Sequence, residues 1–412
     1  MGAVNVFQNT ALVTNEFQLQ LTNRLAFIKG CNNDYASRFT ESMKVGESIK
    51  VRKPPVYKTR SGETFTAQNI EDQYCTMSVQ ETKGVDLEIT SREQMFNFTS
   101  LRDQVIIPAA HALACDIELA AMELATLATF NFVGVPGTVP TALETYNDAR
   151  AIIFDASGPV EKERLIITSA MGVKTSTAGQ SLFNPSQTIS DSFKKGFIGR
   201  HAMAEVYESQ VVKTLTTGPF GGTPAIDGAA QTGATIATKA WTAAAASRLK
   251  AGDIINFAGV YSVNRWTKQS TGRLANFVVT EDFSSEADGT GDVKIAPALV
   301  VTGNYQNVTG SPADGALISI YGTAAAGQAA IAGKSSPQGI RYARNAFLFA
   351  SFDQPLGEGG VVSNMATPDP ESSVRVRFMK AFDISGNVQR YRFDVVWAFG
   401  VAWPELACRV AS

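Results

Sequence analysis

The residues with the clearest potential for chemistry are the two histidines, His111 and His201. A nucleophilic enzyme needs a base beside its nucleophile, and the chain has no G-x-S-x-G elbow and no H-E-x-x-H zinc pair. His111 falls within a predicted helix, and His201 has no nucleophile near it in the sequence. Partners from distant parts of the chain stay open, but the sequence favours a protein without catalytic residues.

A second motif, from Gly327 to Ser335, reads G-Q-A-A-I-A-G-K-S and is close to a phosphate-binding loop. That loop needs four residues between its glycines, because its backbone N–H groups must surround phosphate at one curvature. This chain has five residues there. Ser336-Pro337 also follows at the point where a helix should begin, so we expect no nucleotide cofactor.

Acidic residues and cysteines show no pattern of a metal site. Glu286, Asp288 and Asp292 do not fit the helix-loop-helix calcium spacing, whereas Asp288-Gly289 is a hairpin-turn signal. The four cysteines are far apart and form no C-x-x-C pair, which favours reduced, mostly buried thiols. They are Cys31, Cys75, Cys115 and Cys408. We expect neither a metal site nor a disulfide framework.

The composition is that of an ordered globular protein. The chain has 412 residues, of which 44% are hydrophobic and 18% charged, enough for two or three domains. A formal net charge of −2 argues against an overall electrostatic attraction to nucleic acid. Arg375, Arg377 and Lys380 form a modest basic face, either solvated or available for salt bridges between subunits. The first basic residue is Arg24 and no apolar run reaches about 18 residues, so we expect neither a signal peptide nor a membrane helix.

Two amphipathic segments open the chain. From Val13 to Ile28, apolar residues recur every three or four positions, which predicts a helix that caps its own domain or docks on a partner. From Val45 to Thr90 the period changes to two, around a polar segment at Lys58–Gln73. This pattern predicts a long β-hairpin with a solvated tip. Because an isolated hairpin is marginally stable, it needs a supporting surface in its own domain or on a neighbouring subunit.

The next segments alternate between helix and strand signals. A long Ala-rich helix is predicted from about Leu101 to Phe130, with a kink or break at Pro108. Further along, the predictions are a helix at Glu144–Phe154, a buried strand at Leu165–Thr168, and helix and loop at Pro185–Gln210.

A glycine-rich region lies between Thr214 and Gly339, where 17 of the chain's 34 glycines fall. Short β-type runs such as Asn276–Val279 occur in the same region, and glycine is favoured at turns. We interpret the region as a small β domain inserted into a host fold. After Ala346 the apolar residues alternate again, which predicts long antiparallel strands with a turn at Ser385–Asn387.

This order of elements resembles the major capsid proteins of tailed double-stranded DNA phages, which have the Hong Kong 97-type fold. Three segments carry the resemblance: Lys250–Val263, Ala110–Met122 with C-D-I-E-L-A-A-M, and Trp397–Glu405. The first is similar to a strand-turn-strand of the β-barrel that coat proteins of short-tailed Salmonella phages carry in their axial domain. The other two are similar to the spine helix and the C-terminal strand of that family.

The resemblance implies an α+β fold with an N-terminal arm, an extended hairpin called the E-loop, a spine helix, peripheral and axial domains, and an inserted β-barrel domain. The expected boundaries are 1–44 for the N-terminal arm, 45–92 for the E-loop, 93–140 for the spine helix and peripheral domain, 141–213 for the axial domain, 214–343 for the barrel, and 344–412 for the returning strands of the axial and peripheral domains.

The resemblance also implies a function without catalysis, in which the chain self-assembles into an icosahedral shell that encloses packaged double-stranded DNA. Its partners would be other copies in hexamers and pentamers, a scaffolding protein, a portal protein, DNA without sequence-specific contact, and a decoration protein. The expected location is the virion, after assembly in the host bacterial cytoplasm. The residues expected at intersubunit contacts are Lys58, Arg60, Glu63, Asp72, Phe17, Leu21, Arg375 and Arg377.

Three other functions stay open from the sequence. An encapsulin-like nanocompartment shell has the same fold, but the inserted barrel argues against it. A β-rich surface-binding module would be a soluble monomer that binds glycans. An enzyme with an accessory barrel finds poor support in two histidines and no catalytic motif.

Overall fold

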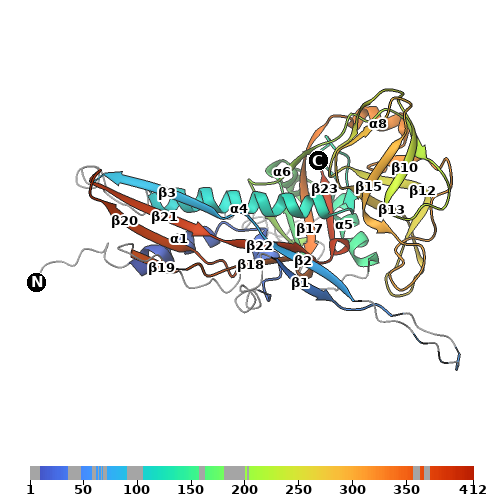
Figure 1. Cartoon of the computed structure of the whole chain (residues 1–412). Coiled ribbons are helices and arrows are strands. Elements are labelled where there is room, and N and C mark those ends of the chain that lie inside the picture. Colours follow the sequence, from blue (N-terminus) through green and yellow to red (C-terminus); the bar gives the residue numbers. More distant parts are fainter. Residues whose placement is uncertain are drawn as a thin grey trace, which may run out of the picture. The chain divides into compact units, whose positions relative to one another are not determined.

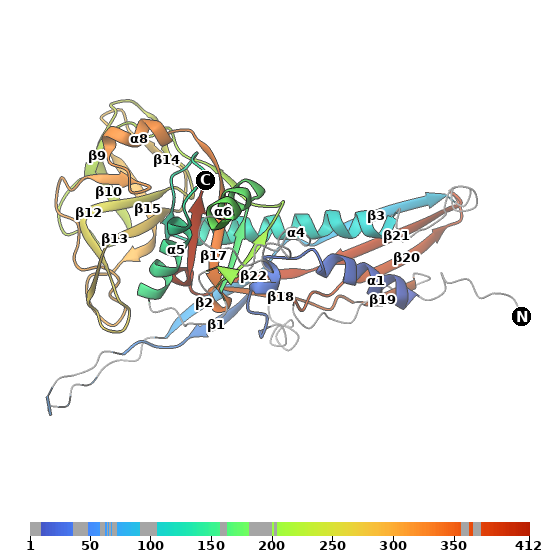
Figure 2. The same cartoon turned by 180° about the vertical axis from the view of Figure 1, so that it is seen from behind.

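The computed structural model describes residues 10–35, 48–57, 62–63, 65, 67, 72–90, 105–156, 163–180, 200–201, 204–355, 362–365 and 372–412. These residues fall into two compact units, each built from segments far apart in the sequence (Figures 1 and 2). Unit 1 draws on Met1–Val51, Tyr74–Ala121 and Phe347–Ala402. Unit 2 draws on Arg52–Gln73, Met122–Ala346 and Trp403–Ser412.

Two four-stranded sheets organise unit 1. Their strand orders are β1-β2-β22-β18 and β19-β20-β21-β3. The strands of the first sheet are β1 (Ser48–Lys53), β2 (Gln73–Val79), β18 (Phe347–Ser351) and β22 (Trp397–Val401). Those of the second are β3 (Lys83–Thr90), β19 (Val362–Met365), β20 (Arg377–Asp383) and β21 (Val388–Val395).

Two stretches of chain supply strands to both sheets, which corrects the extent of two predicted strands. The segment Val45–Thr90 does form a hairpin of β1 and β2, but its last part, β3, pairs with β21 in the second sheet. The alternating run through β21 and β22 likewise divides at Val396. The Val396 carbonyl accepts hydrogen bonds from Ser351 Oγ (2.9 Å) and the Phe352 N–H (3.2 Å). These bonds occupy the carbonyl at the point where the chain changes sheets.

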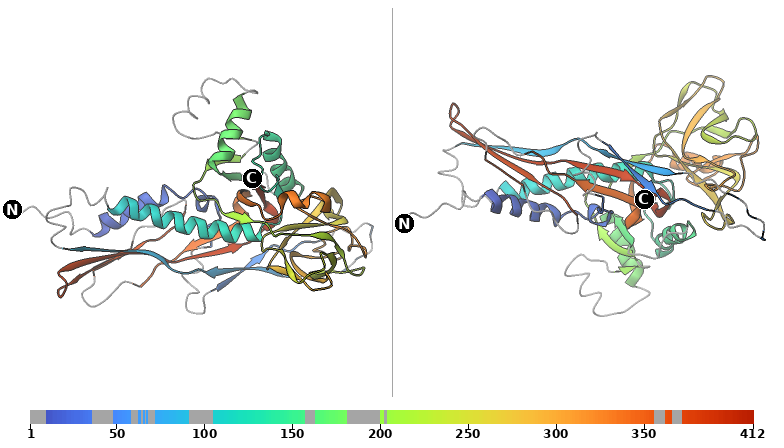
Figure 3. Two further views of the ribbon diagram at one scale, coloured as in Figure 1. Left: turned by 90° about the horizontal axis from the view of Figure 1, so that it is seen from above. Right: turned by 60° about the horizontal axis from the view of Figure 1, so that its bottom comes forward.

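The N-terminal helix is confirmed as α1 (Thr10–Thr22), although it ends before Ile28. It packs on the second sheet (Figure 3). The ring of Phe17 stacks on that of Phe393, with centroids 4.0 Å apart. After α1 the chain reaches Phe27, which directly precedes the 3-10 turn η2 (Ile28–Gly30). The Phe27 N–H donates a hydrogen bond to the Glu118 carboxylate (2.5 Å). This bond satisfies a backbone donor outside the helix, so the chain can turn while Ile28 stays buried.

The long helix is α4 (Ile107–Ala128), and a π-helical turn at residues 105–106 precedes it. Pro108 is the second residue of α4, directly after the π-helical turn, and it has no N–H to donate. The predicted irregularity at Pro108 therefore coincides with the start of the α-helix, and Leu101–Gln104 lie outside the described residues. Ala109, Leu113 and Ile117, which follow one another at intervals of four residues, are buried.

Unit 2 contains a mixed seven-stranded sheet. Its order is β4-β23-β17-β5-β7-β6, with β8 also paired to β17. The strands are β4 (Phe132–Val133), β5 (Glu163–Ile167), β6 (Arg200–His201), β7 (Ala204–Glu208), β8 (Thr214–Thr216), β17 (Ser335–Ala343) and β23 (Ala407–Ala411). The helices of this part are α5 (Leu143–Asp155) and α6 (Ser169–Gln180), and the 3-10 turns are η4 (Arg344–Ala346) and η5 (Pro404–Leu406).

The prediction of helix and loop for Pro185–Gln210 is wrong at its C-terminal end, where β6 and β7 form. Residues 185–199 lie outside the described part of the chain. β7 runs parallel to β5, and the buried Ala204 and Val206 align with Glu163 and Leu165. The segment is too short for its own alternation to predict a strand. Its strand conformation depends on hydrogen bonds to β5, which lies far away in the sequence.

The glycine-rich region forms the predicted β-barrel. Its six-stranded sheet has the order β16-β12-β13-β15-β10-β9, and a bridge between Ala225 and Leu317 joins the two edges, so the sheet is nearly closed. The strands are β9 (Gly222–Ile226), β10 (Gly233–Trp241), β12 (Ile254–Val263), β13 (Ser270–Val279), β15 (Gly291–Leu299) and β16 (Ile318–Ile320). The remaining elements of the region are β11 (Ala246–Leu249), β14 (Phe283–Ser285) and α8 (Ala325–Ile331).

The barrel has a hydrophobic core of its own. Its buried side chains include Ile236, Ile255, Phe257, Phe277, Val293 and Ile295. Asp288-Gly289 forms the predicted turn between β14 and β15, where Asp288 accepts hydrogen bonds from the Thr290 N–H (3.0 Å) and hydroxyl (2.7 Å). A separate core of this kind is what an inserted domain requires.

A buried polar cluster connects the barrel to the C-terminal strand β23 within unit 2. Arg409 is completely buried, and its Nη2 donates to the Gly252 carbonyl (2.8 Å), which also accepts from the Tyr321 hydroxyl (3.3 Å). Asp253 accepts from the N–H groups of Lys250 (2.8 Å) and Gly218 (3.0 Å). Burial raises the pKa of Asp253 to about 6, although these hydrogen bonds and Arg409 oppose the rise.

The stability of the chain should depend on the ionisation of Glu118. Desolvation raises the pKa of its carboxyl to about 7, against the opposing effect of backbone N–H groups around Phe27. Because folding raises this pKa, the associated stabilisation is fully present below the unfolded value of about 4.5 and is lost as the pH rises through about 7. Glutamine cannot ionise, so Glu118→Gln should reduce the loss of unfolding free energy between about pH 5 and about pH 8 by about 2 kcal/mol.

Urea unfolding of the full chain at both pH values measures this difference. Asp253 has a raised pKa in the wild type and the variant alike, so its contribution cancels in the comparison. An unchanged pH dependence in Glu118→Gln would contradict the prediction.

Candidate intersubunit interface

The β1–β2 hairpin buries one row of side chains and exposes the other. Val51, Cys75 and Met77 are buried, and the positions between them are exposed or half-buried. The Cys75 thiol donates to the Val401 carbonyl (3.0 Å). Gly400 permits a close approach, because a Cβ there would lie 3.1 Å from Met77 Cα. Strand β22 therefore holds the edge of β2 within the sheet, and the side chains that alternate with Val51, Cys75 and Met77 are exposed or half-buried.

Phe65 is the most exposed large aromatic residue among those described, with 84% of its surface accessible. It lies in the polar segment between the two arms, near the exposed Glu63. Tyr57 and Tyr74, on either side of this segment, are about half exposed. The sequence analysis did not single out Phe65, although an aromatic residue within a polar hairpin tip is itself a signal of a contact surface.

The four charged hairpin residues expected at an interface have different environments. Lys58 and Arg60 lie outside the described residues. Glu63 is exposed, and Asp72 forms an ion pair with Arg52 across the same hairpin. The pair is largely exposed and contributes about 0–1 kcal/mol. Their contacts to a neighbouring subunit stay a prediction.

The two apolar residues expected at an interface, Phe17 and Leu21, are completely buried in their own chain. Phe17 stacks on Phe393, as described above. Their role in intersubunit contacts stays a prediction, and it would require the side chains to leave this core first.

The two arginines expected at an interface have acidic partners within the chain. Arg375 forms an ion pair with Asp353, and Arg377 Nη2 lies 2.6 Å from Asp394 Oδ2. Arg377 Nη1 also donates to the Pro355 carbonyl (2.9 Å). The face is therefore neither purely solvated nor reserved for a neighbour, and intersubunit salt bridges stay a prediction.

Further ionic residues on β21 and β3 belong to the same sheet surface. Arg392 lies 2.9 Å from Asp394 and 3.4 Å from Asp86, and Arg390 lies 3.3 Å from both Glu88 and Asp383. Sequence reasoning missed these residues. The alternation of apolar residues after Ala346 that predicts these strands also places the arginines on the face opposite to the buried Tyr391 and Phe393, so the signal was present.

His111 and the phosphate-loop motif have ordinary structural environments. His111 Nδ1 accepts from Arg24 (3.1 Å), and the Cys115 Sγ lies 3.7 Å from the same nitrogen. His201 belongs to the short strand β6. The Gly-Lys-Ser sequence at 333–335 follows helix α8, whereas a phosphate loop precedes its helix. Within the described ranges, no three His, Cys, Asp or Glu residues are grouped as metal ligands would be.

One family model matches nearly the whole of this chain. The family model described as P22 coat protein, gene protein 5, matches residues 3–409. None of the curated proteins compared with the chain matches it significantly. No helix in the described part of the chain is long and apolar enough to span a membrane.

Several solved structures are similar to this chain at low identity. One is from Mycobacterium phage Che8, with 12% identity and a TM-score of 0.47 over 94% of this chain and 90% of that chain. Another is the acid-stable capsid of the Helicobacter pylori bacteriophage KHP30, with 9% identity and a TM-score of 0.39 over 89% and 84%. A virus-like particle from Pyrococcus furiosus has 8% identity and a TM-score of 0.38 over 97% of both chains.

Arg377 should matter more for subunit stability than Arg375. Its partner Asp394 has a side chain only 1% exposed, whereas Asp353, the partner of Arg375, is 47% exposed. Removing a partner from a buried carboxylate leaves its desolvation uncompensated, so Arg377→Ala should lower the free energy of unfolding by about 1–3 kcal/mol. Arg375→Ala should cost about 0–1 kcal/mol.

Urea unfolding of the two variants beside the wild type tests this difference. Arg375→Ala serves as the control for Arg377→Ala, because both variants lose an arginine side chain from the same region of the chain. The loss of arginine packing therefore affects both variants. Equal destabilisation by the two changes would show that Arg392 alone satisfies Asp394.

Proposed function

The chain belongs to the P22 coat protein family, and from this premise we propose how it acts as the major capsid protein of a phage. Its role is structural, many copies associate into an icosahedral shell, and the shell is part of the virion. The observation that carries this function is the family match over residues 3–409, which includes the inserted barrel. The predicted α+β capsid fold with an inserted barrel is confirmed by the same match and by the nearly closed sheet.

Assembly into hexamers and pentamers would use the β1–β2 hairpin as an arm over the neighbouring subunit. The exposed aromatic surface near its tip, at Phe65, Tyr57 and Tyr74, supports this role. Burial of apolar surface contributes about 25 cal/mol per Å² before the costs of association, whereas each exposed charge pair contributes about 0–1 kcal/mol. Apolar contacts would therefore dominate the free energy of subunit association. The orientation of the hairpin on the neighbouring subunit would be adjusted by its charged residues, Lys58, Arg60, Glu63 and Asp72.

The domain roles follow the family in this proposal. Residues 1–44 serve as the N-terminal arm, 45–92 as the E-loop and 93–140 as the spine helix with part of the peripheral domain. Residues 141–213 belong to the axial domain, 214–343 to the barrel, and 344–412 to the returning strands. The independent core of the barrel supports a role in stabilising the subunit and in contacts at the outer face of the capsomer.

The other partners in this proposal are a scaffolding protein, a portal protein, a decoration protein and the packaged double-stranded DNA. The near-neutral net charge of −2 suits a container that does not bind its DNA strongly. Assembly would take place in the host bacterial cytoplasm. No specific feature of the described residues favours the two alternatives, an encapsulin-like shell or a surface-binding module.

Electron microscopy tests assembly directly. The full chain, expressed alone and together with a candidate scaffolding protein, should form closed shells with icosahedral symmetry in at least one of the two conditions. A stable monomer in both conditions would contradict the proposal and would favour a binding module instead.

Phe65 should affect assembly without affecting the fold. Because its side chain is 84% exposed, Phe65→Ser should leave the unfolding temperature of the subunit unchanged. Loss of one aromatic contact of about 1.4 kcal/mol would raise the critical concentration for shell assembly about tenfold. Sedimentation of assembled and free subunits over a concentration series measures this.

Phe154→Ser is the matched control, since it makes the same substitution at a residue of α5 that is 58% exposed and lies outside the hairpin. If Phe65→Ser assembled at the same concentration as the wild type and the control, the tip would have no role in the interface.

A further inference from the structure

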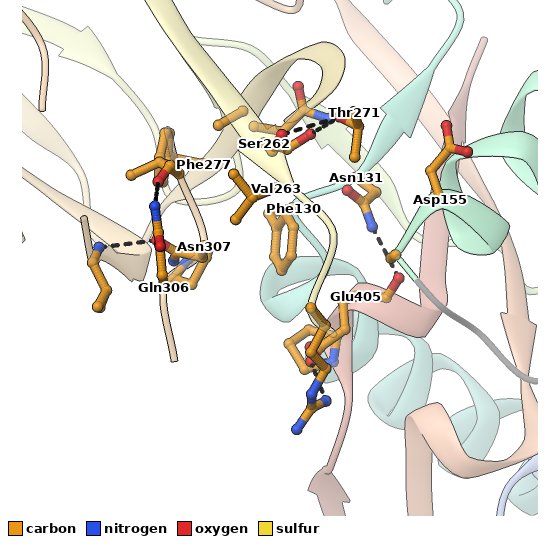
Figure 4. Close-up of a pocket in the computed structure, with 18 of the residues that line it drawn as sticks. Phe130, Asn131, Asp155, Ser262, Val263, Thr271, Phe277, Gln306, Asn307 and Glu405 are labelled. Carbon is orange, nitrogen blue, oxygen red and sulfur yellow. Dashed lines mark hydrogen bonds and ion pairs between the residues drawn. The ribbon is translucent and has the colours of Figure 1, made fainter. Parts of the chain in front are cut away.

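A cavity of about 690 Å³ lies within unit 2, against barrel strands β12 and β13 (Figure 4). Its other walls come from the segment after α4, the end of α5 and the base of the β1–β2 hairpin. The volume is in the range of about 300–1,000 Å³ that pockets for organic ligands occupy. Because the walls come from elements far apart in the sequence, the cavity exists only in the folded unit.

Apolar side chains with accessible surface contribute to several walls of the cavity. Phe130 follows α4, Ile152 belongs to α5 and Val263 ends β12. All three are only half-buried, and Figure 4 shows Phe130 and Val263 at this cavity. A ligand with an apolar ring would therefore displace water from these side chains when it binds.

The charged side chains of the lining are predominantly basic. Arg273 lies 3.3 Å from the Asp155 carboxylate, and Arg265 lies 3.1 Å from the Glu405 carboxylate. The lining contains four basic residues, Lys53, Arg265, Lys268 and Arg273, and two acidic residues, Asp155 and Glu405, so its formal charge is +2. Both carboxylates are paired with arginines, and the excess positive charge therefore corresponds to the two lysines.

Lys53 is the basic residue best placed to receive an anion. It is half-buried, and its ammonium lies 4.8 Å from the centre of the Trp403 ring. The guanidinium of Arg265 stacks on the same ring at 3.9 Å, so two positive charges share one ring. Among the described residues, Arg265 has an ion pair with Glu405, whereas no carboxylate lies within ion-pair distance of Lys53. A partly desolvated charge without a counterion is unfavourable, and a bound anion would offset that cost.

We propose that this cavity is a binding site for a small organic anion, with an apolar ring beside Phe130 and Val263 and one carboxylate at Lys53. The excess positive charge selects for the negative group, and the accessible apolar walls select for the ring. A bound carboxylate would also connect the base of the hairpin with the barrel, because Lys53 and Arg265 come from these two elements. Nothing in shell formation requires this ligand, so the proposal goes beyond the function proposed above.

Two ligands of the same shape test the site on the unaltered full chain before assembly. 2-Naphthoate and 2-acetylnaphthalene share one ring system, but only the first carries a negative charge. Isothermal titration calorimetry measures both dissociation constants. One charge-assisted contact with an ammonium group should make 2-naphthoate bind about tenfold more tightly.

Equal affinities of the two ligands would overturn the selection for an anion. Absence of 2-naphthoate binding up to about 1 mM would overturn the site itself.

A substitution at Lys53 tests which residue receives the carboxylate. Lys53→Met keeps an unbranched side chain but removes the ammonium, so it should weaken 2-naphthoate binding about tenfold and leave 2-acetylnaphthalene binding unchanged. The matched control is Lys294→Met, which removes the same charge from β15 at a side chain that is 54% exposed and does not line the cavity. An equal effect of the two substitutions would show that 2-naphthoate responds only to the general charge of the chain, and it would overturn the proposal.

Two further variants locate the ring of the ligand. Val263→Trp places a larger side chain in the cavity and should abolish binding of 2-naphthoate, whereas the control Leu317→Trp adds the same indole on the barrel at a residue that does not line the cavity. Near-ultraviolet circular dichroism verifies that both variants are folded. Unchanged binding by a folded Val263→Trp would overturn the proposal, and because the comparison of the two ligands uses the wild type, misfolding of the variant would leave that test intact. Shell formation plays no part in any of these measurements.

Discussion

Burial of one arginine, Arg409, is the constraint on which the architecture of unit 2 depends. A guanidinium group removed completely from water is costly unless nearby groups compensate its charge and its donors. The Gly252 carbonyl accepts from Arg409 Nη2, and Asp253 and Tyr321 partly offset the charge, whereas Nε and Nη1 have no hydrogen-bond partner among the described residues. All three compensating residues belong to the barrel region. Burial lowers the pKa of Arg409 and raises that of Tyr321. The free-energy cost of burying Arg409 therefore falls only when strand β23 and the barrel turn at Gly252 and Asp253 are both in their folded positions.

This cluster is also one of the attachments of the inserted domain, beside the apolar contact of Phe132 with Tyr321. The barrel has its own core, and Asp253 binds the N–H of Gly218 at the point where the chain enters the barrel. Gly252 has a φ of +95°, and a Cβ there would lie 3.0 Å from side chains of Leu127 and Leu215. Entry segment, turn and C-terminal strand thus meet at a few polar contacts. The same arrangement leaves a cavity beside β12 and β13, held open by contacts at Asp155 and Glu405.

Unit 1 follows a different rule, in which the alternation of each strand separates an aromatic core from an ionic surface. The stack of Phe17 on Phe393 lies on one side of β21, and the ion pairs of Arg392 and Asp394 lie on the other. Gly84 on β3 is required at this place, because a Cβ would lie 2.5 Å from Asp394 Oδ1. A shell subunit needs such a sheet to be rigid in itself, since its contacts to neighbours add up only when the geometry is fixed.

The sequence by itself determined the kinds of element and their order. Period-three and period-four spacing identified α1 and α4, period-two spacing identified the hairpin and the C-terminal strands, and glycine content identified the barrel, because these patterns follow from local backbone geometry. It could not reveal β7, whose strand state depends on pairing with β5, or the division of β2 from β3 between two sheets. The candidate site was predictable only in part: the charged hairpin residues were visible, while the burial of Phe17, the partners of Arg377 and the position of Lys53 over the Trp403 ring were decided by tertiary structure. The physical reason is that burial and pairing depend on residues tens to hundreds of positions away, and local periodicity carries no information about them.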